Sequence, residues 1–265
     1  MSARMVLVDA FVRGPFSGNP AAVCLPEAPV DADWMQAVAA EMNQAETAFL
    51  VRPRAAEGSD WGLRWFTPTV EVDLCGHATL AAAHVLWSDG LVPRTAALRF
   101  HTRSGVLVAT TRGEQVVLDF PAVPMVACAP PKGLLEALGV QPLSVFRAGP
   151  DYVIETLTVA DVEEARPDLL QLASIPCRGV GLTAKAEVEF DVVSRFFAPA
   201  SGIPEDAATG SLHCALGPFW SKRLRKPVLR CHQASRRGGL LEVEPLGARV
   251  ALAGRATTVL DGRWR

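Results

Sequence analysis

Three residues suited to proton transfer, Glu46, Cys75 and His77, stand beside turns in the first third of the chain. Glu46 opens an otherwise apolar strand pattern, and a carboxylate partly removed from water favours its neutral form, which suits a proton shuttle. A thiol at a helix start can be acidified into a base, although free cysteine is also among the most buried residue types. Spacing alone favours structural roles: a strand-end cap or salt bridge for Glu46, and a backbone hydrogen bond for His77.

Asp206 and Ser211 form a second polar set around the start of a helical pattern. An aspartate a few residues before a helix caps it in most proteins, and Ser211 is then only a polar residue of the first turn. The later segment Gln233–Gly239 combines basic residues with a Gly-Gly turn, and it either binds a carboxylate or closes a hairpin.

The elements that must position these residues follow a pattern that occurs twice. Arg64–Pro68 (RWFTP) reappears as Arg195–Pro199 (RFFAP). Each copy is followed by a turn of small residues, Cys75–Thr79 or Ala208–Ser211, and by a tryptophan about one helix later, with nearly unchanged spacing. A period this long is not that of a solenoid, and it predicts two pseudo-symmetric lobes that face each other across a cleft.

Gly76 and Gly210 occupy equivalent places in the two turns. Glycine lets the backbone approach a ligand closely, and the N-H groups at a helix start form an anion site. For either glycine alone, tight helix packing is the better interpretation. The duplication reverses that preference, because both copies keep the helix opening while their surroundings diverge.

Periodicity predicts an α+β fold with many strands and few helices. The strand patterns cover Met5–Phe11, Thr47–Val51, Gly105–Thr110, Val116–Phe120, Tyr152–Leu157, Glu187–Val193 and Val250–Leu252. The helical patterns cover Asp33–Met42, Leu80–Ser88, Lys132–Leu138 and Leu212–Leu224, with Gly217-Pro218 predicting a kink or restart in the last. A proline-rich stretch places the boundary between an N-terminal lobe, 1–120, and a C-terminal lobe, 121–265, whose last strand, about 256–265, is a candidate to return to the first lobe.

Composition favours a globular protein with a small-molecule partner. With 49% hydrophobic residues and a net charge of −2, the chain can bury a core but lacks the charge that drives binding to nucleic acid or anionic membranes. No apolar stretch reaches the roughly 18 to 20 residues of a membrane helix, and no signal peptide is expected. Six cysteines without a C-x-x-C pair predict a reducing compartment, hence the cytoplasm.

Two cysteine and histidine groupings raise the question of zinc: Cys75 with His77, and His213-Cys214 with Cys231-His232. Structural zinc sites favour ligands two to four residues apart in paired knuckles. These spacings do not supply such knuckles, so no metal is expected.

Taken together, these stretches resemble the PhzF-like family, named for phenazine biosynthesis. The matching segments, in the family's order, are Asp9–Phe11, Phe16–Val23, Asn43–Phe49, Phe66–Pro68, Cys75–Thr79, Phe197–Pro199, Glu205–Ser211 and Gln233–Gly239. The resemblance implies a diaminopimelate-epimerase-like fold of two lobes, each a curled, mostly antiparallel sheet around a central helix. It also implies an active site between the lobes, a homodimer, and neither a metal nor an organic cofactor.

The resemblance assigns roles to individual residues. In the phenazine branch, a glutamate moves a proton between two carbons of a dihydro-hydroxyanthranilate, and Glu46 stands at the matching position. His77 and Asp206 are implied as further catalytic groups. The substrate-binding positions implied by the match are Asn19, Cys75, Gly76, His77, Thr209, Gly210 and Ser211.

One departure from the phenazine pattern leaves three functions open. This chain has Cys75 where the phenazine enzyme has alanine, and epimerases of this fold use a cysteine at that turn as one of two thiol bases. The counterpart in the second lobe falls near Ala208, so a two-thiol epimerase is not expected. The alternatives are an isomerase acting through Glu46, an amino-acid racemase or epimerase with Cys75 as a base, and an inactive small-molecule-binding homologue.

Overall fold

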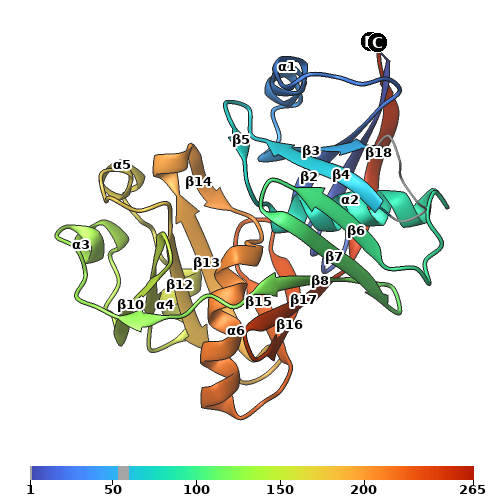
Figure 1. Ribbon diagram of the computed structural model, residues 1–265. Coiled ribbons are helices and arrows are strands. Elements are labelled where there is room, and N and C mark those ends of the chain that lie inside the picture. Colours follow the sequence, from blue (N-terminus) through green and yellow to red (C-terminus); the bar gives the residue numbers. More distant parts are fainter. Residues whose placement is uncertain (1, 53–59) are drawn as a thin grey trace. The chain divides into compact units, whose positions relative to one another are not determined.

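The computed structural model describes residues 2–52 and 60–265. The chain forms two compact units: Met1–Asp119 with Ala253–Arg265, called unit 1, and Phe120–Leu252, called unit 2. The C-terminal strand β18 (Ala256–Trp264) belongs to unit 1, where it pairs antiparallel with β1 (Ala3–Ala10). Figure 1 shows both ends of the chain beside these strands. No helix of the described residues is long and apolar enough to cross a membrane.

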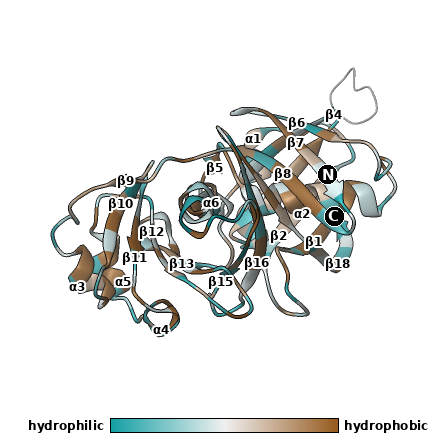
Figure 2. Cartoon of the chain, turned by 90° about the horizontal axis from the view of Figure 1, so that it is seen from below, coloured by the Kyte–Doolittle hydropathy of each residue, from teal (hydrophilic) through white to brown (hydrophobic). Residues whose placement is uncertain are grey.

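Unit 1 is a mixed sheet around one buried helix, α2 (Gly76–Ser88), which packs against β1, β2, β3 and β18. Strands β1 and β2 are largely hydrophobic (Figure 2). The other elements are β2 (Asn19–Pro26), α1 (Ala32–Met42), β3 (Glu46–Val51), β4 (Asp60–Phe66), β5 (Glu71–Val72), β6 (Leu98–Thr102), β7 (Gly105–Arg112) and β8 (Gln115–Pro121).

Unit 2 repeats this design around α6 (Gly210–Leu224), which packs against β15 and β16. Its other elements are β9 (Val126–Ala127), α3 (Leu134–Leu138), β10 (Ser144–Ala148), β11 (Asp151–Glu155), α4 (Val159–Glu163), α5 (Leu169–Ala173), β12 (Val180–Lys185), β13 (Val192–Ala198), η1 (Pro199–Ser201), β14 (Ile203–Asp206), β15 (Leu229–Gln233), β16 (Gly239–Leu246) and β17 (Arg249–Gly254).

The pairing of the strands demonstrates the duplication. From β18 through β1, β2, β3, β4 and β6 to β7, successive pairs are antiparallel, antiparallel, parallel, antiparallel, parallel and antiparallel. From β9 through β10, β11, β12, β13 and β15 to β16 the order is the same. In each copy a short strand, β5 or β14, leads into the central helix.

The repeated arginine has the same structural role in both copies. Arg64 Nε donates to Glu71 at 2.7 Å, and Arg195 Nε donates to Glu205 at 2.7 Å. Each guanidinium also lies over the phenylalanine two positions later, 5.2 Å from the Phe66 centroid in unit 1 and 4.8 Å from that of Phe197 in unit 2. In each unit the arginine–glutamate pair therefore holds the short strand, β5 or β14, on the adjacent strand, β4 or β13, just before the central helix begins.

Helix α6 continues through Pro218 without the restart that the sequence predicts. Proline has no N-H group, so the carbonyl four residues earlier, that of Cys214, loses its helical donor. The Val123 N-H donates to this carbonyl at 3.1 Å instead. The neighbouring Gly217 allows close packing, because a Cβ there would lie 2.5 Å from a methyl group of Val243. Tertiary contacts thus compensate for a local helix breaker.

The strand predicted over Glu187–Val193 is wrong in its first part. The strand there, β13, begins only at Val192, and Val188 is fully exposed. The alternation of charged and apolar residues over 187–191 is typical of a half-buried strand. Here, however, the apolar side chain of Val188 has no core to face.

We expect Arg195→Met to lower the free energy of unfolding by about 3 kcal/mol, because removing one partner leaves a mostly buried carboxylate unpaired. Arg195 is 8% exposed and also donates to the carbonyls of Val162, Glu163 and Ala165. The control is Lys185→Met, which breaks an exposed pair with Glu187 and should cost less than about 1 kcal/mol. Urea unfolding followed by circular dichroism measures both. Equal effects of the two substitutions would contradict this role for Arg195.

Candidate functional site

Glu46 is placed by the end of α1 and the start of β3. Asn43 ends the helix in a left-handed conformation, φ 47°, and its N-H donates to the Ala39 carbonyl. The chain then enters β3 at Glu46, which lies opposite Ala21 of the parallel strand β2. The Glu46 side chain is only 14% exposed. Asn19, the first residue of β2, is also buried.

Cys75 and His77 are placed by the first turn of α2. The helix begins at Gly76, as the sequence predicts, and Cys75 is its N-cap residue with an extended backbone. The Cys75 side chain makes no capping hydrogen bond. Its carbonyl instead accepts from the hydroxyl of Thr79 at 2.5 Å and from the Thr79 N-H at 3.2 Å. The helix start therefore holds the thiol and the imidazole side by side, with Cys75 Sγ 3.5 Å from His77 Nδ1.

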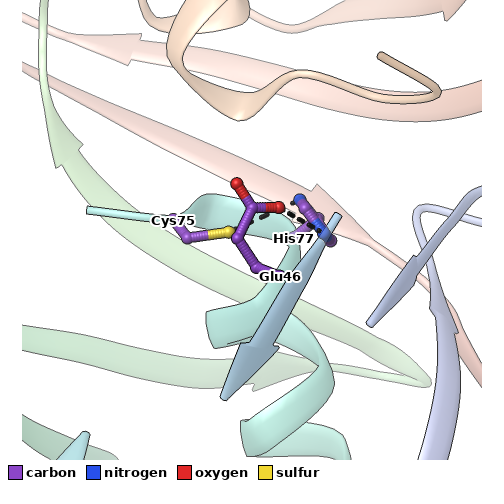
Figure 3. Close-up of side chains that lie close together, drawn as sticks. All are labelled: Glu46, Cys75 and His77. Atoms are coloured by element: carbon purple, nitrogen blue, oxygen red, sulfur yellow. Dashed lines mark hydrogen bonds and ion pairs between the residues drawn. The ribbon is translucent and has the colours of Figure 1, made fainter. Parts of the chain in front are cut away.

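Glu46, Cys75 and His77 converge although they come from a strand, a loop and a helix (Figure 3). His77 Nε2 lies 3.3 Å from Glu46 Oε2, and His77 Nδ1 lies 3.5 Å from Cys75 Sγ. The contact between Nε2 and Oε2 is close but lacks hydrogen-bond geometry, whereas Nδ1 is within hydrogen-bond distance of the thiol. The ring therefore links two groups that can each act as a general base.

The start of α6 is held by Gln233 at the end of β15. The Gln233 side chain accepts from the Thr209 N-H at 2.7 Å and donates to the Asp206 carbonyl at 2.8 Å and to Thr209 Oγ1 at 3.0 Å. Thr209 Oγ1 lies 2.5 Å from Asp206 Oδ2, to which it donates. The helix begins at Gly210, again without a side-chain cap. Asp206, Thr209, Gly210 and Ser211 thus form one polar turn in unit 2.

The segment Gln233–Gly239 closes the hairpin between β15 and β16, which is one of the two interpretations of its sequence. Ser235 Oγ donates to the Ala207 carbonyl at 2.8 Å. A Cβ on Gly239 would lie 2.6 Å from the Ala208 side chain. Only glycine allows the hairpin to pack this closely against the turn that precedes α6.

Arg178 and Asp151, which support Ser211, belong to none of the motifs recognised in the sequence. Arg178 donates to both carboxylate oxygens of the buried Asp151, and its Nη2 donates to Ser211 Oγ at 2.9 Å. Because Ser211 accepts this bond, its own proton can be donated to another acceptor. The duplication offered a signal, since Arg178 lies just before β12, the counterpart of the strand that begins with Glu46.

Equivalent positions of the two helix starts carry different chemistry. The N-cap residues are Cys75 and Thr209, and the second helical residues are His77 and Ser211. The counterpart of Cys75 is thus Thr209, next to the Ala208 expected from the sequence, and it is not a thiol. Thiol, imidazole and carboxylate chemistry is gathered in unit 1, whereas unit 2 offers hydroxyl and carboxylate groups.

His213 occupies the position equivalent to Thr79 and bonds the equivalent carbonyl. Its Nδ1 lies 2.8 Å from the Thr209 carbonyl oxygen. Burial lowers the pKa of His213 to about 4, so the ring is neutral near pH 7. Burial also raises the pKa of the neighbouring Cys214 thiol to about 12. Among residues 2–52 and 60–265, the only group of three potential metal ligands within 4.8 Å is Glu46, Cys75 and His77.

A protein-family model and several known proteins match nearly the whole chain. A family model described as phenazine biosynthesis-like protein matches residues 8–262. A protein of Halalkalibacterium halodurans, named an uncharacterized isomerase, is 46% identical over 262 residues, which cover 98% of this chain and 97% of the relative. The phenazine biosynthesis-like domain-containing protein of Homo sapiens is 38% identical over 290 residues, with 99% of each chain covered.

Solved structures share the fold. A PhzF family protein of Enterococcus faecalis matches with a TM-score of 0.93 and 38% identity, with 100% of each chain covered. A hydroxyproline epimerase of Agrobacterium vitis matches with a TM-score of 0.68 and 12% identity, over 99% of this chain and 92% of the epimerase. These matches confirm the α+β fold of diaminopimelate-epimerase type that the sequence predicts.

The neutral, buried His213 makes stability depend on pH. Its folded pKa of about 4 lies below the unfolded value of about 6.5, so the unfolded state binds more protons between these values. The contribution of His213 to the free energy of unfolding is therefore fully present above pH 6.5 and is lost as the pH falls towards 4. Between pH 7 and pH 5 the loss is about 2 kcal/mol. His213→Thr, which restores the hydroxyl found at Thr79, should remove that loss. If the unfolding free energy of His213→Thr fell between pH 7 and pH 5 by as much as that of the unsubstituted protein, His213 would not be the cause of the loss.

Proposed function

This chain belongs to the phenazine biosynthesis-like family, and we propose that it is an isomerase that moves a proton on a small carboxylated substrate without a metal or organic cofactor. Relatives named isomerases support the general role. The observation that carries the specific proposal is the contact between Glu46, His77 and Cys75 at the start of α2.

In the proposed reaction Glu46 is the general base. Its carboxylate takes a proton from a substrate carbon, the C-H electron pair moves into the adjacent unsaturated system, and the same carboxyl group returns the proton to another carbon. His77 Nε2, 3.3 Å from Glu46 Oε2, stabilises the carboxylate before transfer and orients it. Positioned general acid and base catalysis of this kind contributes roughly a hundred- to ten-thousand-fold in rate.

Substrate binding is proposed for the uncapped helix starts. The first-turn N-H groups at Gly76 and Gly210 suit an anionic substrate group, as does the positive end of each helix dipole. Ser211, with its oxygen engaged by Arg178, donates its proton to the substrate, and Asp206 and Thr209 complete that polar turn. We expect Asn19, at the start of β2, to contact substrate beside Glu46.

A second candidate function is an epimerase or racemase with Cys75 as a base. The observation that favours it is the 3.5 Å separation between Cys75 Sγ and His77 Nδ1, because an imidazole can accept the thiol proton. Unit 2 has Thr209 at the equivalent position, so the second base of such an enzyme would be Glu46 rather than another thiol.

We propose a cytoplasmic homodimer whose partner is a small carboxylated molecule rather than nucleic acid or a membrane. All six cysteines are free thiols, which suits a reducing compartment, and the net charge of −2 provides no polyanion-binding surface.

The two catalytic alternatives predict opposite results for two substitutions. If Glu46 is the base, Glu46→Gln should lower the rate of deuterium uptake from heavy water by roughly a hundred- to ten-thousand-fold, while Cys75→Ala retains uptake within about tenfold. The measurement is mass spectrometry on a panel of small carboxylic acids incubated with the protein. Persistent uptake in Glu46→Gln, together with its loss in Cys75→Ala, would favour the thiol base instead.

Anion recognition can be tested without knowing the substrate. Benzoate should bind and change the tryptophan fluorescence, whereas benzamide, its neutral isostere, should bind at least about tenfold more weakly because it lacks the charge that the helix starts attract. Ser211→Ala should weaken benzoate binding by about three- to tenfold through loss of one hydrogen bond. Equal affinity for benzoate and benzamide would show that the helix starts do not recognise a carboxylate.

A further inference from the structure

We propose that Glu46, Cys75 and His77 bind a thiophilic divalent cation of the Zn²⁺ class, which inhibits the site by occupying its acid and base groups. Sequence spacing argued against zinc because Cys75 and His77 lack a paired knuckle. Paired knuckles are typical of closed structural sites with four protein ligands. Three ligands with one open position is the arrangement of zinc sites that exchange their fourth ligand, and the third ligand here comes from a different element.

The donor atoms suit such a cation in type and spacing. Thiolate, imidazole and carboxylate are the ligands that zinc prefers, at about 2.3, 2.0 and 2.1 Å. Tetrahedral bonds of these lengths place neighbouring donors about 3.3 to 3.7 Å apart. His77 Nε2 and Glu46 Oε2 are already 3.3 Å apart, and the three donors all lie within 4.8 Å of one another. A rotation of the Cys75 side chain towards Nε2 completes the set.

Charge and burial also favour occupation. The side chains of His77 and Glu46 are 6% and 14% exposed, and Cys75 is buried, so an unbalanced charge in this place would be costly. One thiolate and one carboxylate neutralise a divalent cation, while imidazole binds in its neutral form. Binding therefore releases the thiol proton and leaves the ligand set with no net charge.

The consequence for activity rests on the proposed function. A bound cation holds both the Glu46 carboxylate and the Cys75 thiolate, so neither is available to take a proton from carbon. Cation binding itself does not depend on catalysis. It can therefore be measured even if no substrate is ever found.

The test is a titration of the reduced, full-length protein with Co²⁺, whose thiolate complexes absorb in the near ultraviolet. We expect a saturable band with one ion per chain, and Zn²⁺ should abolish it because zinc binds such sites more tightly than cobalt. Cys75→Ser should lose the band, and Glu46→Gln should weaken Co²⁺ binding about tenfold or more. Cys128→Ser, which removes a half-buried thiol in unit 2, is the matched control and should leave the titration unchanged.

A second measurement needs no variant. Zn²⁺ should slow alkylation of Cys75 by iodoacetamide at least about tenfold, as read by peptide mass spectrometry, with Cys128 as the internal reference. Absence of the cobalt band, its persistence in Cys75→Ser, or unprotected Cys75 would overturn the proposed site. If Co²⁺ binds as expected but deuterium uptake proceeds equally with and without Zn²⁺, the site stands and the proposed inhibition fails.

Discussion

The pairing of an arginine with a glutamate, made once in each unit, is the constraint on which the candidate site depends. Arg64 ties Glu71 of β5 to β4, and α2 begins five residues later, at Gly76. Arg195 and Glu205 do the same before α6. A guanidinium largely removed from water, as that of Arg195 is, leaves an uncompensated charge when its partner is lost, so this pair fixes the path of the chain into its helix. The more exposed Arg64 makes the same two-bonded pair with Glu71.

Within this common frame, the two copies have diverged in chemistry rather than in backbone. Thr79 and His213 both bond the N-cap carbonyl of their helix, one through a hydroxyl and one through a ring nitrogen. The other functional groups of the same turns differ: unit 1 has a thiol and an imidazole beside a carboxylate, whereas unit 2 has hydroxyls bonded by Arg178 and Gln233. The two helix starts thus share a backbone path but not a set of functional groups.

The buried cysteines differ in their neighbours rather than in their burial. Cys214 and Cys231 lie in the core of unit 2, where desolvation raises their thiol pKa values well above the ordinary value. His213 is neutral and already engaged with the Thr209 carbonyl. Cys75, although also buried, contacts the ring of His77, which contacts Glu46 in turn. A cysteine with an ionisable neighbour at a helix start has chemistry available that a core cysteine lacks.

The sequence by itself determined the duplication, the glycines that open α2 and α6, the family and the candidate residues Glu46, His77, Asp206 and Ser211. These predictions rest on short motifs and on local rules for helix starts. The two copies of the repeat can be compared with each other, so each copy supports the interpretation of the other. Only the tertiary structure decided that Glu46 lies against His77 and that Arg178 and Asp151 support Ser211. It also decided that Val123 lets α6 pass through Pro218, and that 187–191 is not a strand. These features depend on contacts between residues far apart in the chain, about which local periodicity carries no information.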